Sequence, residues 1–355
     1  VSLSFQCFVL ELARHTAQQA HNTIRHSTQS QRNTLHAARP THPRPPTRTP
    51  AVHRSPHSPR DARRPRALSG DEEEKHQASE DAGEVADMRH ARTMHGCASY
   101  HGRCIVAGGW DIQMQTSDSV EWHHPVLNQW TELGHLWTPR HLLSLVTLDS
   151  QLYAVGGFDH HSQILNYVER YDAPDNCWVS DSTLNVARGG MSVCALGGKM
   201  VGAAGWRMGE DKPGIEPCDV TETFDPVTKK WTLASPLHQA RAQASCCEYE
   251  GEMWVVGGWD EDKRMTSTVE SYNIASDTWT MRPSLPVELV ACALAVMPTS
   301  KGVSLCTLGG FYHEDEKFKY VTDSCFRLDR ELGKWVYEEA LTLPYPCTGH
   351  QMITV

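Results

Sequence analysis

The sequence contains no apolar run close to the roughly 18–20 residues that a helix needs to cross a bilayer. Its opening stretch, VSLSFQCFVLEL, is too short for this and has neither a basic leader nor an initiator methionine, so we expect no signal peptide. Its 12 cysteines include no C-x-x-C pair and no Cys/His spacing typical of a zinc site. We therefore expect buried thiols in a reducing compartment, a cytoplasmic protein, and no membrane or metal partner.

Catalytic signatures are also missing. The sequence has no G-x-S-x-G, P-loop or H-E-x-x-H pattern that would supply a nucleophile, a phosphate cradle or a zinc site. Histidines outside the N-terminal region are scattered or adjacent, as in His123–His124 and His160–His161. Because neighbours on a strand point to opposite faces, such pairs do not readily bind one metal ion. We expect neither an enzyme nor a cofactor.

Acidic residues are nearly absent from the first 70 residues, which hold 2 of them against 11 arginines. This region has no hydrophobic periodicity and too little apolar area to offset its ordering entropy. We predict that residues 1–85 form a disordered, low-complexity tail, either a plain extension or the product of a wrongly assigned 5′ end of the gene. Residues 86–355 carry a net charge of −13, and this acidic body argues against nucleic acid as the main partner.

An internal repeat of about 50 residues fills the acidic body. Five apolar runs end in a small-residue pair, and the second members are 48, 48, 53 and 52 residues apart. The pairs are Gly108–Gly109, Gly156–Gly157, Ala204–Gly205, Gly257–Gly258 and Gly309–Gly310. A tryptophan follows each pair, and seven residues before it stands an aromatic, histidine or leucine side chain. These positions are His123 and Trp130, Tyr171 and Trp178, Phe224 and Trp231, Tyr272 and Trp279, Leu328 and Trp335.

Each repeat divides into four short strands, and its length varies almost only between the glycines and the position seven before the tryptophan, as expected of a surface loop. The large aromatic faces need burial by neighbouring sheets, which predicts an all-β propeller. We predict five complete four-stranded blades and the first strand of a sixth. Their approximate bounds are 89–136, 137–184, 185–237, 238–285 and 286–343, with the partial sixth at 344–355.

The pattern of Gly-Gly, Tyr or Phe before Asp or Asn, and Trp at this period resembles the kelch repeat. The segment TPRHLLSLVTLDSQLYAVGGFDHHSQILNYVERYDAPDNCW is similar to animal kelch-like proteins, and the resemblance covers about residues 86–355. Departures at His123, Ala204, Leu328 and Glu288 weaken individual blades without changing the fold. The resemblance implies six blades, with Cys347–Val355 pairing with three further strands encoded upstream; a five-bladed ring with a spare edge strand is the alternative.

The resemblance also implies that the loops after the glycine pairs line the face that binds a partner peptide. Each loop opens with an aromatic side chain, which serves either as an interface anchor or as packing beneath its own loop. These aromatics are Trp110, Phe158, Trp206, Trp259 and Phe311. In the two longest loops, Arg207 and Lys317 are among the charged residues expected to set specificity.

Four arginines, Arg92, Arg140, Arg188 and Arg241, each stand 16 residues before the first glycine position of their repeat. This regularity predicts a scaffold role, in which hydrogen bonds tie blade edges together, rather than ligand contact. Relatives that bind acidic peptides place arginines two residues further on, where this sequence has Met94, Leu142, Gly190 and Gln243. We therefore expect a ligand other than an acidic peptide.

The function that the resemblance implies is protein–protein interaction, similar to the substrate-recognition kelch domain of cullin-3 ubiquitin ligase adaptors. The expected partner is a protein substrate, with cullin-3 itself a partner only if a BTB domain exists in the full-length protein. The alternative is an actin-binding, cytoskeletal kelch protein.

Overall fold

A computed structural model describes residues 85–210, 213–299, 301–315, 318–343 and 348. These residues form strands and turns, apart from a short 3-10 helix at Glu339–Leu341, which confirms the predicted all-β class. The predicted tail lies outside the described residues except for Val85, and the predicted sixth-blade strand lies outside them except for Thr348.

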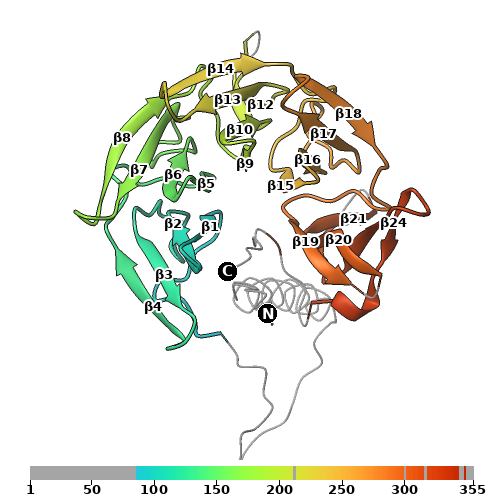
Figure 1. The fold of residues 1–355 in the computed structure, drawn as a ribbon, viewed down its shortest axis with the longest axis horizontal. Coiled ribbons are helices and arrows are strands. Elements are labelled where there is room, and N and C mark those ends of the chain that lie inside the picture. Colours follow the sequence, from blue (N-terminus) through green and yellow to red (C-terminus); the bar gives the residue numbers. More distant parts are fainter. Residues whose placement is uncertain (1–84, 211–212, 300, 316–317, 344–347, 349–355) are drawn as a thin grey trace, which may run out of the picture. The chain divides into compact units, whose positions relative to one another are not determined.

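Five four-stranded antiparallel sheets stand side by side with the first strand of each innermost, which confirms the five predicted blades (Figure 1). The first blade comprises β1 (Gly96–Tyr100), β2 (Arg103–Ala107), β3 (Val120–His124) and β4 (Gln129–Leu133). The second comprises β5 (Ser144–Leu148), β6 (Gln151–Val155), β7 (Tyr167–Asp172) and β8 (Cys177–Thr183). The third comprises β9 (Ser192–Leu196), β10 (Lys199–Ala203), β13 (Thr221–Asp225) and β14 (Lys230–Ala234). The fourth comprises β15 (Ser245–Tyr249), β16 (Glu252–Val256), β17 (Val269–Asn273) and β18 (Thr278–Arg282). The fifth comprises β19 (Ala293–Thr299), β20 (Gly302–Leu308), β23 (Cys325–Asp329) and β24 (Lys334–Tyr337).

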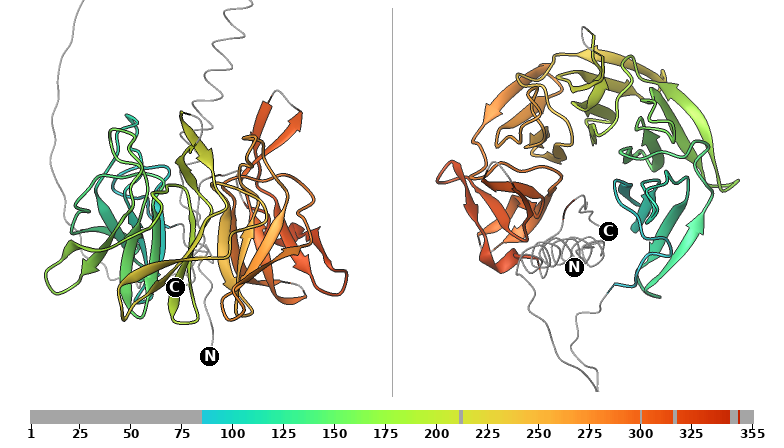
Figure 2. Two further views of the ribbon diagram at one scale, coloured as in Figure 1. Left: turned by 90° about the horizontal axis from the view of Figure 1, so that it is seen from above. Right: turned by 180° about the vertical axis from the view of Figure 1, so that it is seen from behind.

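The two longest loops of the sequence form hairpins of their own. One pairs β11 (Trp206–Met208) with β12 (Ile215–Pro217), and the other pairs β21 (Phe311–Asp315) with β22 (Phe318–Val321). Both project from the same end of the blades, at the upper side of the left panel of Figure 2. Because β2 and its counterparts run toward that end, the turns between the third and fourth strands lie at the opposite end.

The constant seven-residue step is the register of the hairpin between the third and fourth strands. Tyr171 lies directly opposite Trp178, and the same pairing recurs in the other four blades. The two rings of the Tyr171–Trp178 pair are 5.5 Å apart between centroids. A one-residue slip would move both rings to the other face of the sheet, so the pair holds the register.

These aromatic faces pack against the preceding blade. Tyr171 and Trp178 share an apolar cluster with Ile105 of the first blade, and Phe224 and Trp231 pack in the same way against the second. Each tryptophan also reaches backward through its indole N–H, which for Trp178 donates to the Gly134 carbonyl oxygen at 2.8 Å. The stacking that the aromatic repeats predict is therefore the contact that joins the blades.

The stretch Val85–Met88 packs against the apolar cluster of Cys97, Cys104, Val106 and Trp130 in the first blade, as the end of a preceding blade would. The Trp130 indole N–H donates to the Ala86 carbonyl oxygen at 2.7 Å, and the Ala86 N–H donates to the Asn128 side-chain oxygen at 2.8 Å. Gly134 makes the same two bonds with Trp178 and Asn176 of the second blade. Ala86 thus occupies the position of a residue that follows a fourth strand.

The first glycine of each pair allows a close approach between blades. Gly156 has a φ of 57°, and a Cβ there would lie 2.3 Å from the Arg188 carbonyl oxygen of the next blade. The same oxygen accepts a hydrogen bond from the Gly157 N–H at 2.9 Å. Glycine at this position lets the two backbones approach closely. The third blade, with Ala204 at the first position, still makes the equivalent bond from the Gly205 N–H to the Arg241 carbonyl oxygen at 2.8 Å.

The four regularly spaced arginines are buried and form hydrogen bonds within their own blades, so they serve the scaffold as predicted but do not tie one blade edge to another. In the third blade, Arg188 donates to the carbonyl oxygens of Ala204 and Val220 and to the carboxylate of Glu222, at 2.8–3.0 Å. Glu222 also accepts the backbone N–H groups of Asn185 and Val186. Because those two residues lie in the connection that enters the blade, the ion pair fastens each connection to its sheet.

Candidate protein-binding face

Five residues surround the entrance to the space between the innermost strands, at the end of the blades from which the two extra hairpins project. We call them the mouth ring: Met94, Leu142, Gly190, Gln243 and Ala291. All five have φ angles between 51° and 62°, in the left-handed region that residues other than glycine rarely adopt. Backbone strain of this kind, repeated at one place, is a feature of sites that bind ligands.

Main-chain hydrogen bonds link the mouth ring from blade to blade. The Leu142 N–H donates to the Met94 carbonyl oxygen at 2.8 Å, and the Gly190 N–H donates to the Leu142 carbonyl oxygen at 2.7 Å. The Gln243 and Ala291 N–H groups continue the series at 2.9 and 3.3 Å. The Thr348 hydroxyl then donates to the Ala291 carbonyl oxygen at 3.5 Å. The backbone therefore builds the mouth ring without using its side chains.

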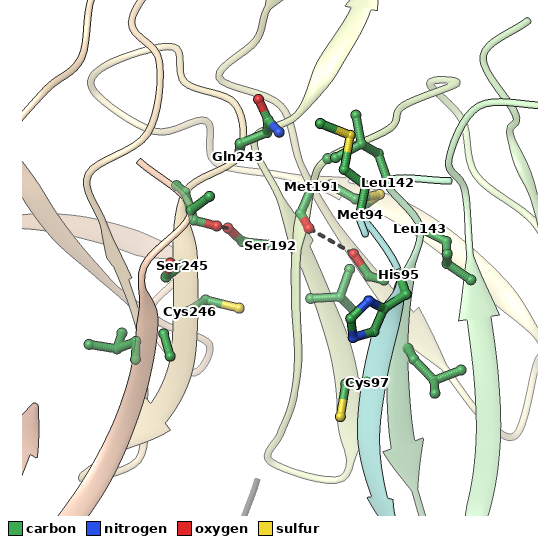
Figure 3. A pocket seen from close by; sticks show the side chains of 18 of the residues that line it. Met94, His95, Cys97, Leu142, Leu143, Met191, Ser192, Gln243, Ser245 and Cys246 are labelled. Atoms are coloured by element: carbon green, nitrogen blue, oxygen red, sulfur yellow. Dashed lines mark hydrogen bonds between the residues drawn. The ribbon is translucent and has the colours of Figure 1, made fainter. Parts of the chain in front are cut away.

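A cavity of about 220 Å³ lies beneath the mouth ring (Figure 3). Residues at the start of the inner strands and just before them line it, and many of these are apolar, including Leu143, Met191 and Leu294. Among the described residues, none of those lining the cavity carries a formal charge when the histidine is neutral. The cavity thus suits an uncharged group, because a charge placed there would lose its hydration without gaining a counter-ion.

Three serines of the cavity wall are already used for bonding between blades. The Ser144 hydroxyl donates to the Met191 carbonyl oxygen at 2.7 Å, and the Ser192 hydroxyl donates to the Ala244 carbonyl oxygen at 2.9 Å. The Ser245 hydroxyl donates in the same way to the Cys292 carbonyl oxygen. We call these the serine bonds. Their hydroxyl protons are not available to a ligand.

His95, which precedes β1, is a polar residue of the cavity wall that differs from the serines in its hydrogen bonding. Its side chain is buried, and neither ring nitrogen has a hydrogen-bond partner among the described residues. Burial, together with the positive charge of Arg92, lowers the pKa of His95 to about 3. At neutral pH the ring is therefore uncharged, with one N–H to donate and one nitrogen to accept.

The five aromatics predicted from the loops lie around the mouth ring at different depths. Phe158 is buried, while Trp110, Trp206, Trp259 and Phe311 are half-buried. The Trp259 indole N–H donates to the Gln243 side-chain oxygen at 3.0 Å, and Trp206 lies against Gly190. Trp110 stacks on His141 of the next blade at 4.2 Å between centroids. Each aromatic thus supports the mouth ring or a neighbouring loop and, except for Phe158, keeps part of its surface accessible.

The two charged residues predicted to set specificity in the long loops add no free charge to the described part of this face. Arg207 pairs with Glu210 at 2.6 Å and with Glu216 at 3.1 Å, so its charge is met within its own hairpin. Lys317 lies outside the described residues. Exposed apolar side chains occur instead on three of the loops around the mouth: Ile112, Met114, Met208, Ile215 and Tyr320.

Parts of the site have no signal in the sequence. The spacing from the arginines identifies four of the five mouth-ring positions, whereas Ala291 follows Leu289 and has no such signal. His95 was not selected because a single histidine beside a glycine resembles any other strand residue. No local pattern distinguishes the buried glutamates opposite the arginines, such as Glu222, from exposed carboxylates.

Across the described residues, no helix has the length and apolar character that crossing a membrane requires. In the same part of the chain, no three His, Cys, Asp or Glu side chains gather where they could hold a metal ion.

Seven of the described cysteines are buried and three are half-buried. Burial raises the pKa of the Cys292 thiol to about 11, so this thiol stays protonated at neutral pH.

Comparison with known proteins agrees with this geometry. The kelch motif matches residues 91–136, 139–185 and 240–286, which contain the first, second and fourth blades. Alpha-scruin of Limulus polyphemus is 24% identical over 287 residues, covering 76% of this chain and 29% of that protein. Kelch-like protein 36 of Mus musculus is 27% identical over 249 residues, covering 68% of this chain and 38% of that protein. The chain therefore spans well under half the length of these two relatives.

Among solved structures, that of YjhT is similar with a TM-score of 0.62 at 16% identity, covering 74% of this chain and 87% of that one. At this identity the likeness is one of fold. The repeat spacing, the blades with their paired aromatics, the matched motif and the kelch-like relatives lead to one assignment: the chain carries kelch repeats and resembles the propeller of animal kelch-like proteins.

Proposed function

We propose that this propeller is a protein-recognition module that holds a segment of a partner protein against its binding face, meaning the mouth ring and the loops around it. The observation that carries the proposal is the mouth ring itself, a set of half-buried residues on a strained backbone that main-chain hydrogen bonds link from blade to blade. Half-buried aromatics and exposed methionine and isoleucine side chains surround it, which is a typical composition for an interface centre.

The finer proposal is that this recognition selects substrates for a cullin-3 ubiquitin ligase. It is supported by the resemblance to kelch-like proteins, and it requires a BTB domain elsewhere in the full-length protein. The competing class, an actin-binding cytoskeletal protein, shares the kelch repeat and is separated by the experiment below.

The test compares three forms of the chain in affinity purification from cell extract and in co-sedimentation with F-actin. One carries Ile112→Asp and Met208→Asp, which place two charges on the binding face at exposed positions. The matched control carries Val126→Asp and Val227→Asp, at exposed turns on the opposite end of the blades. All four sites are exposed, so each substitution should change stability by less than about 0.5 kcal/mol.

We expect the wild type and the control to retain a soluble partner. The affinity of the binding-face variant for this partner should be at least about tenfold lower. The proposal fails if the binding-face variant retains the partner while the control loses it. Co-sedimentation of the wild type with F-actin, reduced in the binding-face variant, would favour the cytoskeletal class instead.

A further inference from the structure

The cavity below the mouth ring contains one polar group whose state the fold does not explain. His95 is buried with both ring nitrogens unpartnered among the described residues, whereas the serines beside it are all bonded. In Figure 3 its imidazole lies at the cavity wall above Cys97, across from Ser245 and Cys246. Buried polar groups are almost always hydrogen-bonded, so an unpartnered ring facing a cavity indicates a missing partner.

The rest of the wall restricts what that partner is. Apart from His95 and Gln243, the polar side chains lining the described cavity are the three bonded serines and cysteines. The Gln243 side-chain oxygen already accepts a hydrogen bond from Trp259. An acidic or basic ligand group would therefore find no counter-charge and no preorganised cluster of donors there.

The size of the cavity matches a side chain. An apolar cavity of about 150 Å³ holds a benzene molecule. At about 220 Å³, the present cavity has room for one aliphatic or aromatic side chain, lined by Leu143, Met191 and Leu294. Flexible methionines at Met94 and Met191 allow the wall to adapt to chains of different shape.

We propose that the cavity receives one apolar side chain from an uncharged segment of the partner protein, and that His95 forms a hydrogen bond to the main chain of that segment. This inference rests on the proposed function, because it assigns a ligand chemistry to the same face. A neutral imidazole can donate to a peptide carbonyl oxygen or accept from a peptide N–H, so it can bind the backbone of an extended segment whatever its sequence.

The first test selects binders from a phage-displayed library of random linear peptides on the immobilised full chain. We expect the enriched peptides to share an uncharged core containing Leu, Ile, Met or Phe. Replacing that apolar residue with Glu in a synthetic peptide should weaken binding at least about tenfold. An acidic or basic core would overturn the inference and leave the proposed function intact. If no enriched peptide binds the propeller, both proposals fail.

The second test separates binding from folding with His95→Leu. One neutral hydrogen bond should be lost to the ligand, so the affinity for the selected peptide should fall about 3- to 10-fold. The thermal midpoint should stay unchanged or rise, because an unpartnered polar ring leaves the interior. His124→Leu, at the far end of β3 and outside the cavity, should leave the affinity unchanged.

The two measurements on His95→Leu together decide the question. Unchanged affinity in this variant would overturn the inference, since His95 would then have no role toward the ligand. A lowered thermal midpoint with unchanged affinity would also overturn the inference. It would show that the His95 ring stabilises the fold and does not contact the ligand.

Discussion

At the scale of single residues, the repeat shows which positions the backbone constrains and which it does not. The first position of each glycine pair has a φ near 60°, and four of the five blades have glycine there. The third blade has Ala204 at a φ of 63°. The left-handed region costs an L-residue roughly 1–2 kcal/mol. Ala204 is therefore a residue at which the fold keeps avoidable strain.

Ala204→Gly should stabilise the protein by about 1 kcal/mol, because it removes the strain at the positive φ, less the greater chain entropy of glycine in the unfolded state. Gly156→Ala, the same change in reverse at the equivalent position, should destabilise it by more, since a Cβ there meets the Arg188 carbonyl oxygen. Urea unfolding of both variants measures the two effects. Equal and opposite changes would show that contact between the blades plays no part.

Asp277 predicts a dependence of stability on pH. Its carboxylate accepts hydrogen bonds from the Tyr272 hydroxyl at 2.6 Å and the Ser235 N–H at 2.9 Å, which lower its pKa in the folded protein. The unfolded chain, with a pKa of about 3.9, therefore takes up protons first as the pH falls. The resulting stabilisation is complete above that pKa and is lost as the pH falls through the folded value.

Asp277→Asn supplies the control, because Asn176 occupies the same position in the second blade and bonds to Tyr171 and Gly134. The stability advantage of the wild type over Asp277→Asn should shrink between about pH 6 and about pH 3. Thermal unfolding at several pH values gives this difference directly. An advantage that grows on acidification would contradict the assignment.

At the scale of the element, four blades are held by the same buried ion pair and the fifth is not. The positions of Arg241 and Glu270 in the fourth blade correspond to Leu289 and Phe326 in the fifth, where both residues belong to one apolar cluster. The same place in the blade is therefore filled by a buried ion pair in four blades and by an apolar pair in the fifth. Replacing a buried ion pair by apolar residues is often neutral, whereas removing one partner leaves a buried charge alone.

Arg188→Leu should destabilise the protein by about 3–5 kcal/mol, because Glu222 remains buried without its partner. Adding Glu222→Phe, so that the third blade takes the residues of the fifth, should recover a large part of this loss. The recovery stays incomplete because the N–H groups of Asn185 and Val186 lose their acceptor. Denaturant unfolding of the single and double variants checks this, and a double variant less stable than the single one would refute it.

The blades could be predicted because their signals lie close together along the chain. The pairing of Tyr171 with Trp178 is a local hairpin, so its register appears directly as a constant spacing. The partner of Arg188 lies 34 residues away in a sheet that forms only after folding, and no local pattern distinguishes Glu222 from an exposed carboxylate. The same holds for His95, whose burial depends on strands from other blades.

At the scale of the whole molecule, two layers of hydrogen bonds join the blades around the cavity. The mouth ring forms the upper layer through main-chain groups, and the serine bonds form a lower layer through side chains. The first blade has Gly96 at the serine position, where a Cβ would lie 2.9 Å from that of Leu145, so it makes no such bond to the second. The contact between the first two blades therefore relies on apolar packing, the mouth ring and the bonds that Gly109, Thr147 and Trp178 donate to carbonyl oxygens of the neighbouring blade.

Ser144→Ala and Ser192→Ala should each destabilise the propeller by about 1 kcal/mol, the usual value of one intramolecular hydrogen bond. Because the two bonds join different pairs of blades, the double variant should show close to the sum. Differential scanning calorimetry would test both the values and the additivity. A double variant no less stable than either single one would mean that the two junctions are not held independently.

The mouth ring has a consequence for engineering. Its frame is made of peptide groups, so no particular side chain is needed at Met94, Leu142, Gln243 or Ala291, although their positive φ angles exclude proline and disfavour β-branched residues. Gly190 is the exception, since a Cβ there would press on Trp206 and Gln243 at 3.2 Å. The four remaining positions are therefore suitable for randomisation. A combinatorial library that varies them would retarget the propeller to new peptides without redesigning its blades.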